Sequence, residues 1–314
     1  ALSPHEDRRF EDGEHKLRPL VYPRGNDVYV IGSLHGGPHD SPQDKLLRML
    51  VFIATLRDHG ADRVTAVVPY LAYARKDRRT QPFDPVTLRC VAQLFEAVGT
   101  AQLIVLEAHD VAAFQNAFRC TTLHLSAHQV FDAVAAALPA DTPLAVVSPD
   151  PGGVKRALLW REELAEKLAR PVGFAMIDKR RAAGVTSSEN LVAGDVAGMS
   201  VLLLDDLIAS GGTVRSAAVA LRRAGAREVL AFAAHGLFVA PAAEQLADPA
   251  IARIVVCDSV PPFRLPADGA AARKLQVVSA VPLFARAIRD CHETWLHRCR
   301  RGPPAPPAPA GHAR

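Results

Sequence analysis

One segment, residues 201–213 with the sequence VLLLDDLIASGGT, constrains the fold more than any other part of the chain. Its four leading apolar residues predict a strand buried on both faces, as in a parallel sheet covered by helices. Asp205 and Asp206 stand where that strand is expected to end, and open α/β sheets bind ligands at this edge. Adjacent carboxylates buried without partners would be costly, so an ordinary strand–turn–helix corner is the weaker interpretation.

The loop after the two aspartates is suited to a phosphate. Gly211 and Gly212 tolerate positive φ and let backbone N–H groups approach an anion, while Ser210 and Thr213 offer hydroxyl groups. The carboxylates would repel a bare phosphate. They suit the hydroxyls of a sugar, or a metal, while the loop holds a phosphate on the same sugar. The segment therefore predicts a phosphorylated pentose as the ligand.

Strand and helix periodicity alternate along most of the chain, which predicts parallel sheets covered by helices. We expect strands at 28–31, 64–68, 103–106, 144–147, 173–177, 201–204 and 229–234. We expect helices at 46–60, 84–99, 154–168, 213–224 and 282–297, the second with Asp84 as its N-cap. The series divides near Ala140, so the fold class is α/β with two doubly wound parallel-sheet domains, 1–140 and 141–281. The tail, 300–314, is rich in proline and alanine and should be disordered.

Composition excludes several classes of protein. The chain has 314 residues, 49% hydrophobic and 22% charged, as expected for a soluble globular protein of about two domains. It contains no apolar run of about 18 residues and no visible signal peptide, so we expect neither a membrane protein nor a secreted one. The net charge of +4 is modest and does not require nucleic-acid binding. The cysteines lack metal-site or redox spacing, which favours reduced thiols and a cytoplasmic location (Cys90, Cys120, Cys257, Cys291 and Cys299).

Functional groups follow the other predicted strands at their carboxyl ends. A basic run, 75–79, follows the second strand, and Glu107 and His109 follow the third. Asp150 follows the fourth strand, and a basic segment, 178–181, follows the fifth. Each feature has an ordinary explanation, because a lone histidine is more often structural and a basic run is usually solvated. Their shared position relative to the strands is the stronger signal for a common site.

In this order the segments resemble the ribose-phosphate diphosphokinases, or phosphoribosyl pyrophosphate synthetases. The matching pieces are FEDGE (10–14), PYLAYARKD (69–77), the His109 segment that ends in AFQNAF (113–118), VVSPDPGGVKRA (146–157), IDKRR (177–181), GDVAG (194–198), the pentose-phosphate loop and AAHGLF (233–238). The resemblance implies two domains of the type I phosphoribosyltransferase kind, with the active site in the cleft between them. It also implies transfer of the diphosphoryl group of ATP to C1 of ribose 5-phosphate, which gives 5-phosphoribosyl 1-diphosphate and AMP.

The resemblance also assigns roles to particular residues. Lys179 and Arg181 would be the catalytic pair that neutralises developing charge, on a lid continued by residues 182–190. Asp205 and Asp206 would hold the pentose hydroxyls, and the 5-phosphate would be held by Ala209, Ser210, Gly211, Gly212 and Thr213. The expected ATP-binding residues are Phe10, Asp12, Glu14, Arg75, Lys76 and His109.

Magnesium is expected because a triphosphate bound for transfer is normally metal-chelated. By resemblance its protein ligands would be His109 and Asp150. In the family the FEDGE-like loop serves the active site of a neighbouring subunit, which implies a homo-oligomer, a dimer or a hexamer. By resemblance, the last helix packs back on the first domain. No nucleic acid or membrane partner is expected.

The chain departs from the family pattern in several places. Lys76 stands where glutamine is usual, and Thr80 stands where an acidic residue is usual. Residues 32–43 do not resemble the family text, and residues 22–24 keep the arginine of an allosteric phosphate segment without its serine. The strand and helix that normally precede FEDGE are missing, so either the N-terminus is trimmed or a neighbour replaces that strand.

Three alternative functions remain open to comparison. A non-catalytic regulatory homologue would be favoured by loss of Lys179, Arg181, His109 or a paired aspartate, and all of these are present. A phosphoribosyltransferase would need a base-recognition segment that we do not find. A kinase acting on another phosphosugar fits the same motifs, because Lys76 and Thr80 touch the expected donor site.

Overall fold

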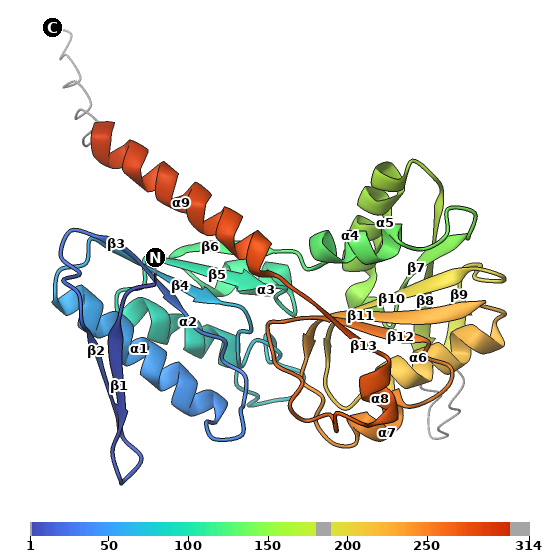
Figure 1. Ribbon diagram of the computed structural model, residues 1–314, viewed down its shortest axis with the longest axis horizontal. Coiled ribbons are helices and arrows are strands. Elements are labelled where there is room, and N and C mark those ends of the chain that lie inside the picture. Colours follow the sequence, from blue (N-terminus) through green and yellow to red (C-terminus); the bar gives the residue numbers. More distant parts are fainter. Residues whose placement is uncertain (1, 180–189, 302–314) are drawn as a thin grey trace, which may run out of the picture.

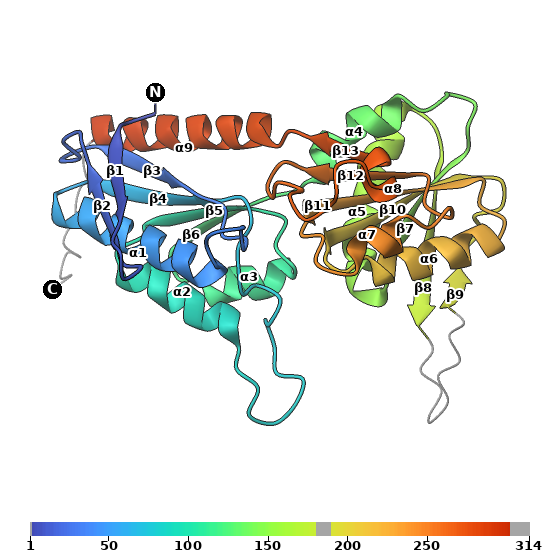
Figure 2. The same ribbon diagram turned by 60° about the horizontal axis from the view of Figure 1, so that its bottom comes forward.

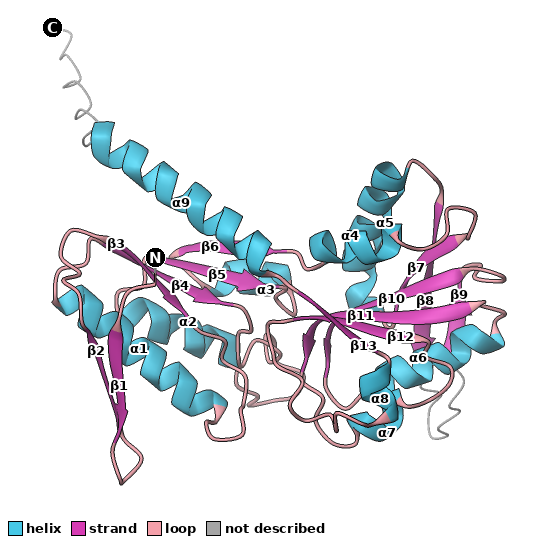
Figure 3. Cartoon of the chain, in the orientation of Figure 1, coloured by secondary structure: helices cyan, strands magenta, loops and turns pink. Residues whose placement is uncertain are grey.

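The strands of the first half form a parallel sheet with helices on both faces (Figures 1 and 3). The computed structural model describes residues 2–179 and 190–301. Within these residues the sheet order is β3 (Asp27–Ile31), β4 (Arg63–Val68), β5 (Gln102–Leu106), β6 (Thr121–Leu125). Because strand order follows chain order, right-handed crossovers place the connecting helices on one face. Figure 2 shows them beneath the sheet: α1 (Pro42–Asp58), α2 (Thr87–Ala97) and α3 (Val111–Ala117).

The second half is a larger, mostly parallel sheet whose strand order reverses direction. Among the described residues the order is β13 (Leu275–Val278), β12 (Arg253–Cys257), β11 (Glu228–Gly236), β10 (Ser200–Ile208), β7 (Leu144–Ser148), β8 (Val172–Lys179), β9 (Asn190–Ala193). Only β9 runs antiparallel to its neighbour in this part of the chain. The reversal lies between β7 and β10, the kind of place where open α/β sheets bind ligands.

Helices cover both faces of this second sheet. On one face, buried side chains of the strands pack against α6 (Gly212–Arg223), α7 (Ala242–Leu246) and α8 (Ala270–Arg273). On the other face they pack against α4 (His128–Ala136) and α5 (Val154–Leu168). The second core also includes Val67, Ile104 and Leu106 of the first sheet, so the two halves share buried apolar surface. The predicted fold class is confirmed.

The boundary between two domains that we expect near residue 140 stays a prediction. The helix α4 precedes that point in the chain but packs on α5, as Figure 1 shows. Trp160 of α5 donates its Nε1–H to Asp132 of α4 at 2.9 Å, and the ring of Trp160 lies 6.1 Å from that of Phe131. A short 3₁₀ helix, η1 (Pro151–Gly153), precedes α5.

Most predicted strands and helices are found within a few residues of their expected ends, but one helix start is wrong. Asp84 is not the N-cap of α2, which begins at Thr87 without a side-chain cap. The Asp84 carboxylate instead accepts hydrogen bonds from the backbone N–H groups of Thr80 and Gln81, both at 3.0 Å, and from the Thr80 hydroxyl. It also binds Lys76. These loop donors compete with the helix for the same carboxylate.

The C-terminal helix α9 (Val281–Arg301) lies across the first sheet on the face opposite α1–α3 (Figure 2). A buried cluster of ion pairs joins α9 to the first sheet. Arg63 donates from Nε and Nη2 to the two carboxylate oxygens of Asp27, at 2.7 and 2.8 Å, and from Nη2 to the carbonyl of Cys291 at 3.1 Å. His292 of α9 contacts Asp27 Oδ2 at 2.8 Å. Burial alone would raise the pKa of Asp27, but the bonds from Arg63 and His292 more than offset it and lower that pKa.

We expect His292→Ala to lower the free energy of unfolding by about 1.5 kcal/mol, because it removes a hydrogen bond to a buried carboxylate. The matched control is His297→Ala, which changes an exposed side chain on the same helix. Urea unfolding of the two variants and the parent checks this. The difference should shrink as pH falls through the lowered pKa of Asp27, since protonation removes the acceptor charge. Equal midpoints for both variants would contradict the role assigned to His292.

Some predictions fall outside the described residues. The lid proposed for residues 182–190 lies there except for Asn190, the first residue of β9. Of the segment expected to be disordered, residues 300 and 301 belong to α9 and residues 302–314 are not described. In the described part of the chain, no helix is long and apolar enough to cross a membrane.

Candidate active site

His109 and Asp206 meet where the two halves face each other. His109 follows β5 of the first sheet, and Asp206 lies in β10 of the second. The His109 Nδ1 atom is 2.6 Å from Asp206 Oδ2. This bond to Asp206 raises the pKa of His109, and the carboxylate fixes the ring with its Nδ1–H toward Asp206. Two residues assigned to different substrates by the sequence therefore lie in direct contact.

The strand that carries the aspartates is longer than predicted. The strand β10 continues through both aspartates to Ile208, because β11 pairs with it as far as Ile208 opposite Gly236. On the other side, pairing with β7 ends at Leu203 opposite Val147. At the two aspartates, β10 is therefore paired with β11 on one side. On its other side, no described strand pairs with β10 beyond Leu203.

The two aspartates have different electrostatic surroundings. Asp206 is only 4% exposed, yet its pKa is lowered, because the His109 hydrogen bond and the Arg156 charge outweigh the effect of burial. Burial and the negative charge of Asp206 raise the pKa of Asp205 well above its usual value. Asp205 Oδ1 accepts the backbone N–H of Asp206 at 2.9 Å. The pair therefore presents one firmly ionised carboxylate and one that is easily protonated.

The residues around this contact were given no functional role from the sequence. Arg156 of α5 donates to Glu107 Oε1 at 2.8 Å and to the carbonyl of His109 at 3.1 Å. His235, buried at the end of β11, bonds through Nε2 to the carbonyl of Leu106 at 3.1 Å. Its Nδ1 atom lies 2.8 Å from the hydroxyl of Ser259. Arg156 and His235 do lie in the matched segments, but nothing in a single sequence indicates that they connect the halves.

Asp150 lies at the turn between β7 and α5. Its Oδ1 atom accepts the backbone N–H groups of Gly152 at 2.9 Å and Gly153 at 3.2 Å. No side chain fits at Gly153, because a Cβ there would lie 2.7 Å from the Ser148 hydroxyl oxygen. The turn therefore holds the carboxyl group in place.

The loop 209–213 leads into α6 in the way a phosphate site requires. Gly211 has φ +80° and is the N-cap of α6, and in the described structure no side chain caps this end of the helix. The first N–H groups of a helix lack intrahelical partners and, with the helix dipole, favour an anion. The loop between β10 and α6 therefore lies next to the two aspartates in the chain, and the N–H groups at the start of α6 can donate to an anion.

We expect Gly211→Ala to weaken ribose 5-phosphate binding, because alanine is strained at positive φ and its Cβ would approach Leu246 to 3.0 Å. The control is Gly198→Ala, at φ +72°, where no atom of the described residues lies within 4 Å of the added Cβ. Both variants share the backbone strain of about 1–2 kcal/mol, so only the first should change binding measured by calorimetry. Equal affinities for both variants would contradict the phosphate assignment.

Three of the predicted nucleotide residues are not brought to this site within one chain. Phe10, Asp12 and Glu14 lie at the turn of a hairpin formed by β1 (His5–Arg9) and β2 (His15–Pro19). The hairpin projects from the side of the first half away from the second (Figure 1). Its turn is exposed, with Phe10 38% accessible. The expectation that this turn completes the active site of a neighbouring subunit stays a prediction.

The basic residues after β4 differ in their surroundings. Arg75 is exposed, whereas Lys76 is half-buried and binds the Asp84 carboxylate and the Thr80 hydroxyl, the latter at 2.9 Å. The two departures from the family pattern, Lys76 and Thr80, thus contact each other and share one carboxylate. In this structure Lys76 organises its own loop, and its assignment to ATP stays a prediction.

The structure describes only part of the catalytic pair expected at Lys179 and Arg181. Lys179 is the last residue of β8, and the position of its side chain is not described. Arg181 lies outside the described residues. The strand β8 is a neighbour of β7, which leads to Asp150, so its end lies on the same side of the sheet. The catalytic roles of both residues stay predictions.

The residues present fit a magnesium ion bound mainly by substrate. In the described part of the chain, no group of three or more His, Cys, Asp or Glu side chains could hold a metal ion alone. Mg²⁺ commonly uses one or two protein ligands together with phosphate oxygens and water. With Nδ1–H of His109 donated to Asp206, the Nε2 atom is the ring nitrogen left to bind a metal. Asp150 offers a carboxylate oxygen from the neighbouring strand end.

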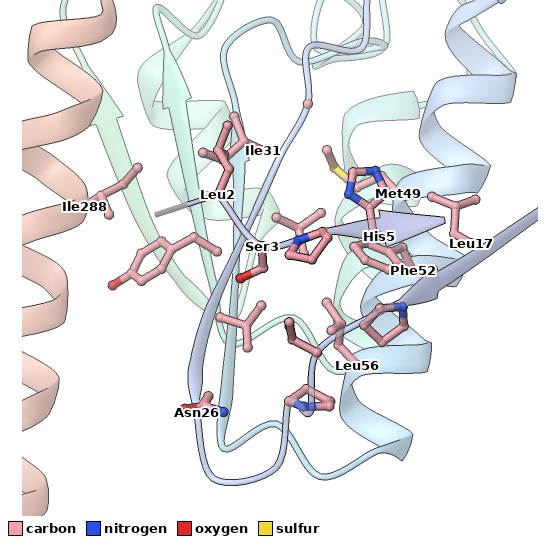
Figure 4. A pocket seen from close by; sticks show the side chains of 18 of the residues that line it. Leu2, Ser3, His5, Leu17, Asn26, Ile31, Met49, Phe52, Leu56 and Ile288 are labelled. Carbon is pink, nitrogen blue, oxygen red and sulfur yellow. The ribbon is translucent and has the colours of Figure 1, made fainter. Parts of the chain in front are cut away.

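A pocket of about 1030 Å³ lies elsewhere, between β3, the N-terminal segment and α1 (Figure 4). Its apolar side chains include Ile31, Met49 and Phe52, and Ile288 of α9 lies at its edge. None of the predicted site residues that the structure describes lines it. The pocket is therefore separate from the candidate active site.

The sheets, the paired aspartates and the glycine loop define an α/β enzyme with a type I phosphoribosyltransferase-like fold. A family model described as the N-terminal domain of ribose phosphate pyrophosphokinase matches residues 1–99, and a phosphoribosyl synthetase-associated domain matches residues 182–296.

Curated relatives extend the match to nearly the whole chain. Ribose-phosphate pyrophosphokinase of Aquifex aeolicus is 35% identical over 285 residues, which cover 90% of this chain and 86% of that protein. The enzyme of the same name from Caldanaerobacter subterraneus is 35% identical over 93% of this chain and 88% of its own length. The crystal structure of phosphoribosylpyrophosphate synthetase from Mycobacterium smegmatis has a TM-score of 0.80 at 30% identity, covering 94% of this chain and 92% of that one. The chain belongs to the ribose-phosphate pyrophosphokinase family and is an enzyme of that family.

Proposed function

We propose that this enzyme transfers the β,γ-diphosphoryl group of ATP to the C1 hydroxyl of ribose 5-phosphate, releasing AMP. The observation that carries the proposal is the contact of 2.6 Å between His109 and Asp206. His109, from the first half, suits the metal–nucleotide side, while Asp206, from the second half, suits the sugar hydroxyls. Their contact brings donor and acceptor sites together, as direct transfer requires.

The reaction forms a bond between the C1 oxygen and the β-phosphorus and breaks the bond from the β-phosphorus to the oxygen that bridges to the α-phosphorus. That bridging oxygen leaves with AMP, and the C1 hydroxyl loses its proton. Negative charge grows on the leaving and equatorial oxygens, so the protein contributes mainly positioning and positive charge. Mg²⁺ would neutralise phosphate charge when bound.

Each group of residues has a separate part in this proposal. Asp205 and Asp206 bind the 2- and 3-hydroxyls of the pentose, and the loop 209–213 binds its 5-phosphate. His109 and Asp150 hold the metal, and Lys179 and Arg181 stabilise the transferred group. The adenine nucleotide is bound by Phe10, Asp12 and Glu14 of a neighbouring subunit in a homo-oligomer, together with Arg75 and Lys76. We further propose that this metabolic enzyme acts in the cytoplasm.

The test is to incubate the purified protein with ATP, Mg²⁺ and ribose 5-phosphate and to separate AMP from ADP by chromatography. AMP formed only in the presence of ribose 5-phosphate supports diphosphoryl transfer. ADP would instead identify a kinase that transfers a single phosphoryl group. Absence of both products at high protein concentration would contradict the proposal and favour a regulatory homologue.

A further inference from the structure

Arg156 contacts the candidate site from the second half, although it carries none of the roles assigned above. It lies in the first turn of α5, six residues after Asp150, with its side chain 14% exposed. Its Nε atom donates to Glu107 Oε1 at 2.8 Å, and its Nη2 atom donates to the carbonyl oxygen of His109 at 3.1 Å. One guanidinium group therefore binds both ends of the segment that carries His109.

Glu107 is itself held in place from several directions. Its side chain is 4% exposed, and its Oε2 atom accepts the backbone N–H of Ala127 at 2.9 Å. Its own N–H donates to the carbonyl of Leu125 at 2.9 Å. Its φ of +44° lies in the left-handed region, which is unfavourable for a residue with a Cβ and persists only where surrounding contacts enforce it. The hydrogen bond from Arg156 is therefore accepted by a carboxylate whose position is fixed by other contacts.

The charge of Arg156 also acts on the paired aspartates. Burial alone would lower the pKa of Arg156, but the carboxylates of Glu107, Asp206 and Asp205 more than offset it and raise that pKa. The guanidinium therefore stays charged. Its charge also lowers the pKa of Asp206, which favours the ionised form of this buried carboxylate.

We propose that Arg156 is a positioning residue of the reaction, which binds Glu107 and the His109 carbonyl together and so fixes His109 against Asp206. This inference rests on the proposed function. The geometry requires a planar group with two donors at a fixed separation, which arginine has and the single ammonium group of lysine lacks. Displacing a positioned group by about 1 Å can lower turnover about 10²-fold.

The test compares Arg156→Lys with Arg161→Lys, which changes an arginine on the same helix that pairs with Glu162 at the surface. We expect Arg156→Lys to lower kcat by roughly 10- to 100-fold and to raise KM for Mg²⁺–ATP, because displaced His109 holds the metal less well, with little change in KM for ribose 5-phosphate. Arg161→Lys should match the parent. The double variant Arg156→Met/Glu107→Gln, which removes both members of this ion pair together, should fold and show a loss at least as large. It replaces Arg156→Lys as the decisive variant if the latter does not fold.

A crystal structure of the variant provides a readout besides activity. We expect the distance from His109 Nδ1 to Asp206 Oδ2 to lengthen from 2.6 Å beyond hydrogen-bond range. Unchanged kcat in both Arg156 variants, or an unchanged distance, would overturn the inference. A purely structural role would lower melting temperature while the folded fraction kept full turnover. If the parent protein forms no AMP, the proposed function fails, and the change in this distance still decides whether Arg156 positions His109.

Discussion

Lys179→Ala and Arg181→Ala are each expected to lower kcat by about 10²–10³-fold, the scale seen when one preorganised charge stabiliser is removed. The two positions carry this expectation because they match the catalytic basic pair of the family, and because Lys179 ends β8, whose neighbour β7 leads to Asp150. Charge that develops only during transfer is stabilised only then, so KM should change little. Steady-state kinetics with both substrates varied gives kcat and KM separately.

The intervening Arg180 provides the control for this pair. Arg180 is not a member of the basic pair that matches the family, so Arg180→Ala should retain most of the activity. The double variant Lys179→Ala/Arg181→Ala should lose less than the product of the single losses, because both residues would serve the same transferred group. If Lys179→Ala instead melts much earlier and its folded fraction keeps full turnover, the catalytic assignment is wrong.

Asp206→Asn should weaken ribose 5-phosphate binding by roughly 10- to 150-fold, which corresponds to loss of a charged hydrogen bond of about 1.5–3 kcal/mol. Asp206 has a lowered pKa and is therefore the ionised member of the pair. Asp205→Asn should have a smaller effect, because the raised pKa of Asp205 favours its neutral form, whose shape asparagine copies. Calorimetric titration with ribose 5-phosphate measures both variants.

Metal-free ATP provides the comparison ligand for this experiment. Its affinity should change much less than that of ribose 5-phosphate in both variants, since the aspartates are assigned to the sugar. Asp206→Asn also removes the ionised acceptor of His109, so binding of Mg²⁺–ATP should weaken in that variant alone. Unchanged ribose 5-phosphate affinity in both variants would contradict the assignment of the pair.

The sequence was most informative where one residue acts locally. The apolar run before Asp205 predicted the strand, and Gly211 predicted a turn with positive φ, because both depend on neighbours in the chain. Gly60, with φ +84°, follows the end of α1 for the same reason. Local conformation and burial leave a signature within a few residues, and such features can be predicted from a single chain.

Contacts between distant segments could not be predicted in the same way. Arg156 and Glu107 are 49 positions apart, and His109 and Asp206 are 97 apart. Their pairing depends on how the two sheets face each other, which periodicity does not encode. Asp84 illustrates the limit at short range: Asp-Pro predicts a helix start, but Lys76 and Thr80 provide competing partners once the loop has folded.

In the proposed reaction the C1 hydroxyl of ribose 5-phosphate attacks the β-phosphorus of ATP. The most direct measurement uses ATP labelled with radioactive phosphorus at the β position, incubated with Mg²⁺, ribose 5-phosphate and the enzyme. We expect the label to leave the nucleotide completely, to appear in the diphosphate of the sugar product, and to be absent from the AMP formed. Label that remains in ADP while the sugar product is unlabelled would contradict this reaction.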